Sequence, residues 1–150
     1  MNQSQNFIAL WAEGRTRFAK LLTNIKAEDV QKTLAPAPNS AGFLIRHTAE
    51  VELLFAKNVF KAEGVEVHAK TVIDQKDTGE WTNLPELLLY QQNAADKLQE
   101  IIQSQAENSW LETVTTKEFG TITKAAALGR IVTHTAYHAG QLALILKYGK

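Results

Sequence analysis

Three of the four histidines in this 150-residue chain fall on the inner faces of predicted helices. His134 and His138 are four residues apart, which places their Cβ atoms about 5–6 Å apart on one helix face. Two imidazoles at this spacing can hold one first-row metal ion, and a third ligand must then come from another segment. His47 lies on a second inner face, whereas His68 lies in a polar loop, where we expect it to be solvated. The pattern predicts a metal site formed by His47, His134 and His138.

The alternative is that these histidines are neutral core residues satisfied by hydrogen bonds, which is the commoner state of a buried imidazole. Three unpaired imidazoles among apolar neighbours would cost on the order of several kcal/mol, and a shared cation removes that cost. Three neutral nitrogen ligands leave coordination positions open, which is typical of catalytic zinc sites. Histidine suits zinc, nickel, copper and iron(II), so the ligand type does not select the metal.

Glu50 lies one helical turn after His47, near the same inner face. It could be a fourth metal ligand, a general base acting on metal-bound water, or an acceptor for a histidine N–H. The competing interpretation is a glutamate that faces solvent, as we expect of Glu52.

Gln141 follows His138 by three residues and could orient a ligand or a bound water molecule. A hydrogen bond between helices would explain it equally well. Arg15 lies at the edge of the first apolar face and could contact an anionic substrate, although such a side chain more often extends to water.

Four segments carry apolar residues at the three-, four- and seven-residue spacings of one helix face. They cover about residues 6–26, 40–63, 83–102 and 123–148. Asn39 or Ser40 is a good N-cap for the second segment, and Asn83 opens the third. Gly64 and Gly149 are placed to end the second and fourth.

Two polar stretches separate these segments, at about residues 65–81 and 105–122. Some β-like alternation occurs over 65–73, so we expect minor strand content there. We therefore predict an all-α fold, a four-helix bundle of the up-down type with two longer loops, in a single domain over 1–150. The long loops leave room for crossover connections.

The composition excludes several classes of function. Sixteen basic and sixteen acidic residues give a formal net charge of zero, which argues against a nucleic-acid partner and against a polybasic membrane-surface protein. No apolar run is long enough to span a bilayer. The absence of cysteine excludes disulfides, thiolate metal sites and cysteine nucleophiles. The N-terminal residues lack the basic start and apolar stretch of a signal peptide, so we expect a cytoplasmic protein.

Two motifs resemble those of the DinB-like family. NSAGFLIRHTAEVELLFAKNVF resembles the second helix of that family, with one histidine followed by a glutamate. THTAYHAGQLALILKYG resembles its last helix, with an H-x-x-x-H-x-G-Q core and a closing glycine. Two positions depart from the family pattern: Ala139 stands where many members have arginine, and Thr133 where asparagine is frequent. These departures leave the histidines intact but weaken any transfer of substrate specificity.

The resemblance implies a four-helix bundle in which His47, His134 and His138 bind a divalent metal ion, with zinc or nickel favoured and iron also compatible. It implies a homodimer. Members of the family include transferases or isomerases that activate a low-molecular-weight thiol at the metal, and others that look like metal-dependent hydrolases.

Two functions therefore follow from the sequence. The first is a metal-dependent enzyme with a small-molecule substrate, for which a low-molecular-weight thiol is one candidate. The second is a non-catalytic, homodimeric stress-response module that binds a metal or a small ligand. A deep pocket beside the three histidines, with Glu50 or Gln141 pointing into it, would favour the enzyme. A site sealed by packed aromatic side chains would favour the module.

Overall fold

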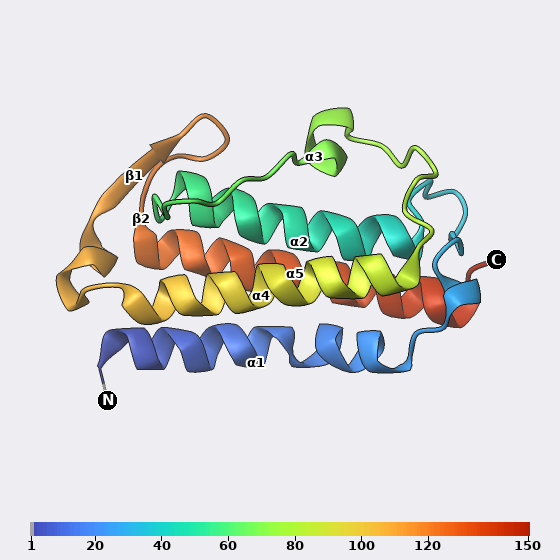
Figure 1. Ribbon diagram of the computed structural model, residues 1–150, viewed down its shortest axis with the longest axis horizontal. Helices are drawn as coiled ribbons and strands as arrows, with labels where there is room; N and C mark the ends of the chain where they lie inside the picture. Colours follow the sequence, from blue (N-terminus) through green and yellow to red (C-terminus); the bar gives the residue numbers. More distant parts are fainter. Residues whose placement is uncertain (1) are drawn as a thin grey trace.

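Four long helices lie side by side along the molecule (Figure 1). The computed structural model describes residues 2–150. The long helices are α1 (Gln3–Asn24), α2 (Ala41–Asn58), α4 (Leu84–Ser104) and α5 (Lys124–Tyr148). The shorter elements are η1 (Ala27–Asp29), α3 (Lys70–Asp74), η2 (Glu107–Leu111), β1 (Thr113–Thr116) and β2 (Gly120–Thr123). The chain is mostly helical, as the sequence predicts.

Side-chain caps fix where three of the long helices begin. The hydroxyl of Ser40 accepts a hydrogen bond from a backbone N–H in the first turn of α2, and Asn83 and Thr123 do the same for α4 and α5. Each cap satisfies a backbone donor that has no partner inside its helix. Gly149 directly follows α5. These predicted boundaries are confirmed.

The predicted end of α2 at Gly64 is wrong, because the helix already ends at Asn58. Val59 and Phe60 turn into the core instead of continuing the helix, and both are buried. The ring of Phe60 packs edge-on against Trp110, with the ring centroids 5.9 Å apart. Gly64 lies in the following loop, at a φ of 68°.

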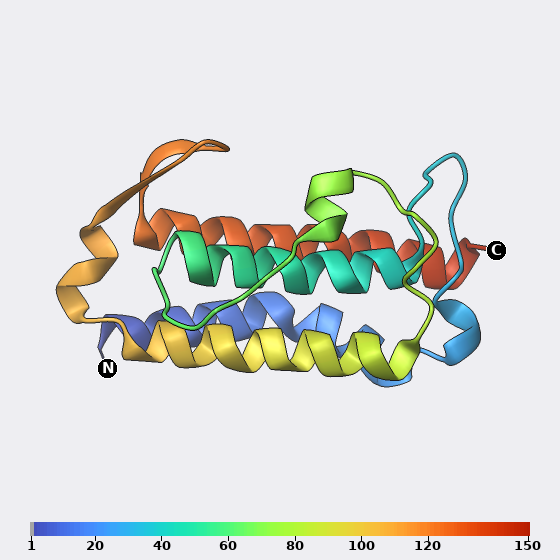
Figure 2. The same cartoon turned by 45° about the horizontal axis from the view of Figure 1, so that its top comes forward.

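Helices α2 and α4 run in the same direction (Figures 1 and 2). Gly42, at the start of α2, lies against the carbonyl oxygen of Trp81, just before α4 begins. A Cβ atom at Gly42 would come within 1.9 Å of that oxygen, so only glycine permits this approach. Residues 59–83, which connect the end of α2 to the start of α4, therefore run back along the length of the molecule. The predicted up-down order is wrong at this connection.

A β-hairpin joins η2 to α5, where the sequence predicts only a polar stretch. Strands β1 and β2 pair in antiparallel fashion, with Thr113 opposite Thr123 and Thr116 opposite Gly120. The strand content expected over 65–73 is absent from that segment, which carries α3 at its end. Val65 and Ala69 are buried there, so the alternation reflects an extended segment packed on the core without a partner strand.

Two apolar clusters fill the space between the helices. One surrounds Trp110 and includes Phe55 and Ile131, and the other surrounds Phe18 and includes Phe43 and Leu142. On α2 and α5, the three histidines of the predicted site fall between residues of the first cluster and residues of the second. None of the helices in residues 2–150 is long and apolar enough to cross a membrane.

Candidate metal centre

The structure brings the three helical histidines together. The Nε2 atom of His134 lies 3.2 Å from Nε2 of His47 and 3.1 Å from Nε2 of His138. Helix α2 supplies the first of these side chains and α5 the other two. His68 is exposed in the connection between α2 and α4 and takes no part in the cluster.

The spacing of these nitrogens fits one divalent ion. Three nitrogens that each lie about 2.0–2.1 Å from a tetrahedral zinc ion are about 3.3–3.4 Å from one another. The two Nε2 separations of 3.1 and 3.2 Å are close to that value. Potential ligand atoms of the three histidines all lie within 4.8 Å of one another. The cluster is compatible with metal binding.

A chain of hydrogen bonds sets the tautomer of His47. The carboxylate of Glu50 accepts the hydroxyl proton of Thr71, over 2.5 Å. The Thr71 oxygen then has only lone pairs left for His47, whose Nδ1 lies 3.0 Å away. His47 must therefore donate from Nδ1–H, which leaves the lone pair on Nε2 free to bind a metal.

His138 also carries its proton on Nδ1, but its hydrogen-bond partner is a different residue. Its Nδ1 lies 2.6 Å from the carbonyl oxygen of Gln141, which can only accept a hydrogen bond. The lone pair of Nε2 therefore faces the other two histidines. His134 differs, because its Nδ1 is buried and has no hydrogen-bond partner within residues 2–150.

Burial keeps all three imidazoles neutral near pH 7. It lowers the pKa of His47 to about 4, and the neighbouring His138 adds to this effect. It lowers the pKa of His134 to about 3, with smaller contributions from His138 and His47. Burial also lowers the pKa of His138, although the hydrogen bond to Gln141 opposes the shift. Neutral imidazoles are the form that metal binding requires.

Glu50 is connected to the histidine cluster through Thr71. Its side chain is fully buried and accepts hydrogen bonds from the Thr71 backbone N–H (2.9 Å) and from Nε of Arg46 (2.7 Å). The Arg46 guanidinium is itself held over the ring of Tyr90, at 3.5 Å from the ring centroid. The sequence allows Glu50 to accept a hydrogen bond from a histidine N–H, but its donors in residues 2–150 are Arg46 and Thr71, and only Thr71 contacts His47.

Sequence reasoning missed Thr71 and Arg46. Arg46 directly precedes His47 and is four residues before Glu50, a helical ion-pair spacing that gives a usable signal. Thr71 gives no such signal, because it reaches the centre from a segment far away in the sequence.

The expectation that Glu52 faces solvent is wrong. Its side chain is fully buried and forms an ion pair with Arg15 of α1, which is also buried and does not extend to water. The Arg15 guanidinium lies over the ring of Trp11, 5.0 Å from the ring centroid. Burial raises the pKa of Glu52, although Arg15 opposes the shift. This pair joins α1 to α2 and does not touch the histidines.

A cavity of about 1220 Å³ opens beside the histidine cluster. His47 and His134 form part of its wall. The rest of the wall comes from α2, α5, the β1–β2 hairpin and the connection that carries α3. Glu50 and Gln141 are not among its lining residues, because both lie on the Nδ1 side of the histidines.

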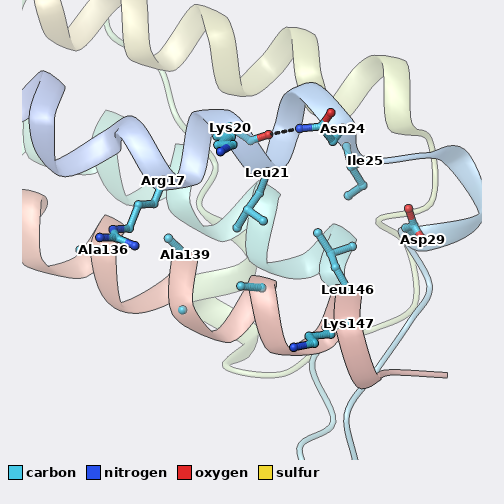
Figure 3. A pocket seen from close by; sticks show the side chains of 12 residues that line it. Arg17, Lys20, Leu21, Asn24, Ile25, Asp29, Ala136, Ala139, Leu146 and Lys147 are labelled. Atoms are coloured by element: carbon cyan, nitrogen blue, oxygen red, sulfur yellow. Dashed lines mark hydrogen bonds between the residues drawn. The ribbon is translucent and has the colours of Figure 1, made fainter.

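A second hollow, of about 680 Å³, lies between α1 and α5 (Figure 3). Ala136 and Ala139 of α5 line it, and Arg17 extends from α1 toward Ala136. None of the three clustered histidines contributes to it.

Comparison with known proteins agrees with this architecture. The model of the DinB superfamily matches residues 10–142. A crystal structure of a conserved protein from Enterococcus faecalis superposes with a TM-score of 0.69 at 16% sequence identity, over 98% of this chain and 96% of that one. Because the identity is low, this likeness shows a shared fold alone. No curated protein matches the chain. The family match covers most of the sequence and both histidine motifs, and the chain therefore belongs to the DinB superfamily.

Proposed function

We propose that the chain binds one divalent metal ion through Nε2 of His47, His134 and His138, and that it is a metal-dependent enzyme acting on a small molecule. The observation that carries the proposal is the meeting of three Nε2 atoms beside a large cavity, of which His47 and His134 form part of the wall. The hydrogen bonds at Nδ1 of His47 and His138 support it, because they direct the lone pairs toward one point. In this proposal, the long helices form a four-helix bundle that places ligands from two helices around one ion.

A bound divalent ion would act as a Lewis acid toward the substrate or its nucleophile. Three histidines leave coordination positions free, and the cavity gives a small molecule access to them. Thiol-dependent transfer or isomerisation and hydrolysis are the two reaction classes we propose. The chain has no cysteine, so a thiol nucleophile would have to come from a separate small molecule.

Within this proposal, Glu50 and Gln141 are positioning residues. Glu50 holds His47 through Thr71, and Gln141 holds His138 directly. The open cavity supports the enzyme over the non-catalytic module, for which a site sealed by aromatic side chains is expected. The second feature expected of the enzyme is not met, because neither Glu50 nor Gln141 lines the cavity. Zinc and nickel are the metals we propose first, and iron(II) also suits three histidines.

The function can be tested with protein purified without a histidine tag and loaded with zinc or nickel. We would assay conjugation of a low-molecular-weight thiol to a chromogenic electrophile, and hydrolysis of a nitrophenyl ester. We expect turnover in one assay that stops on chelation and returns with metal. His134→Ala should abolish it, whereas His68→Ala, the matched control, should retain it. Equal rates with and without metal, or in wild type and His134→Ala, would contradict the proposal.

The homodimer and the cytoplasmic location stay predictions. Light scattering at micromolar concentration tests the first: a dimer of two 16.7 kDa chains is expected, and a mass near 17 kDa would exclude it.

A further inference from the structure

The cavity beside the histidines extends well beyond the metal centre. Along α2 its wall includes His47, Val51 and Asn58, which share one helix face. The eleven residue-to-residue steps from His47 to Asn58 correspond to about 16 Å of helix at the usual rise. The β1–β2 hairpin and α3 lie on the same side of α2 and α5 (Figure 2), and residues of both contribute to the cavity wall. A ligand at the histidines therefore has room for a long body.

Several apolar side chains form part of the cavity wall. Val51, Leu54 and Phe55 of α2 contribute to it, with Phe119 of the hairpin and Tyr137 of α5 on other sides. Cavities lined in this way bury the apolar body of a ligand and use a few polar groups to orient it.

The charged groups on the wall are predominantly basic. Lys61, Lys117 and Arg130 line the cavity, and Glu118 is the one acidic residue among its lining residues. None of the three basic side chains forms an ion pair with any residue in 2–150. The chain as a whole has a net charge of zero, so this excess of positive charge is local.

Arg130 is the basic residue best placed to act together with the metal centre. It lies one turn before His134 on α5, which corresponds to about 6 Å along the helix axis. Its guanidinium lies 4.9 Å from the ring centroid of Phe119, so the hairpin holds it at the cavity wall. A planar guanidinium binds a carboxylate through two parallel hydrogen bonds.

We propose that the cavity binds an amphipathic carboxylate, with the carboxylate on Arg130 and the apolar body against the α2 wall, beside the three histidines. That this carboxylate is the substrate rests on the proposed function. That the cavity binds it rests only on the shape of the cavity and the charges on its wall.

The test uses 4-phenylbutyrate and the matched neutral ligand 4-phenylbutan-1-ol, with calorimetry or NMR shifts on the full chain. We expect the acid to bind about tenfold more tightly than the alcohol, which is the scale of one charge-assisted interaction. Arg130→Gln should remove this preference by weakening the binding of the acid. Arg130→Glu should make the acid the weaker ligand. Arg17→Gln is the matched control, because it removes the same charge from the other hollow, and it should keep the preference.

Equal binding of acid and alcohol to wild type would overturn the inference. An unchanged preference in Arg130→Gln would also overturn it. The same loss of preference in Arg17→Gln would overturn it too, because the preference would then reflect only the net charge of the protein.

The titrations are run with zinc and with chelator. The protein could fail to take up zinc and still prefer the acid in a way that depends on Arg130. That result would support carboxylate binding in the cavity and contradict the proposed metal function. Zinc uptake without any preference for the acid leaves the metal function standing and overturns this inference. Acid binding that needs zinc but not Arg130 also overturns it.

Discussion

Two glutamates on α2, only two residues apart, are both fully buried but belong to different regions of the molecule. Glu50 faces the histidine side, where its carboxylate accepts three hydrogen bonds from Arg46 and Thr71. Glu52 faces α1, where Arg15 is its partner, and its Oε2 atom has none among the residues the structure describes. Burial alone therefore does not place a glutamate at the histidine cluster. The contact through Thr71 to His47 distinguishes the two.

The largest effect we expect comes from breaking the pair on the α1 side. Arg15→Ala leaves the buried Glu52 without its partner, so the free energy of unfolding should fall by about 3–5 kcal/mol. Urea denaturation of the zinc-free protein measures this. The Arg15→Met/Glu52→Leu double variant should recover most of the loss, because it removes both charges together. Zinc affinity of the folded protein should not change, and a large loss of affinity in Arg15→Ala would contradict the separation of the two regions.

The second prediction concerns the histidine side. Thr71→Val removes the hydroxyl between Glu50 and His47, so the zinc affinity should fall by about 10–100-fold, as is usual for groups that support a ligand. Competition with a chromogenic chelator measures it. Thr48→Val is the matched control, because this buried threonine is next to His47 and donates instead to the carbonyl of Leu44. Equal affinities in the two variants would show that the Thr71 contact does not support His47.

The two regions should also respond oppositely to acid. The pKa of His47 is about 4 in the folded protein, below its ordinary 6.5, so the unfolded chain takes up this proton first as the pH falls. His47 therefore contributes stability that is present above about pH 6.5 and is lost toward pH 4. The raised pKa of Glu52 has the opposite effect on stability. The stability that Glu52 contributes is fully present below its ordinary pKa of 4.5 and is lost as the pH rises through its pKa in the folded protein.

Denaturation of zinc-free protein between pH 7 and pH 4.5 checks this smaller effect. We expect the free energy of unfolding to decrease as the pH is lowered in wild type, and to decrease less steeply in His47→Gln. Glu52→Gln should make the decline steeper toward the acid end, because it removes the opposing contribution. An identical slope in all three proteins would show that neither group is linked to folding in the expected way.

Local signals in the sequence were enough to predict part of this structure. Ser40, Asn83 and Thr123 begin their helices because an N-cap acts within a few residues of itself. The spacing of His134 and His138 similarly places both imidazoles on one face of α5.

The features that sequence reasoning missed depend on distant partners. Nothing near Glu52 indicates that Arg15 meets it from another helix, and nothing near Thr71 indicates that it reaches His47. The direction of α4 depends on the path taken by residues 59–83, which local patterns do not fix. Gly64 has the residue type of a helix end, yet the burial of Val59 and Phe60 ends α2 earlier.

We propose above that His47, His134 and His138 jointly bind one metal ion. X-ray absorption at the zinc edge, combined with elemental analysis of protein purified without a histidine tag, tests it most directly. We expect one zinc ion per chain with three imidazole nitrogens at about 2.0–2.1 Å. This signal should be lost in His47→Ala and kept in His68→Ala. An unchanged zinc content and coordination in His47→Ala would contradict it.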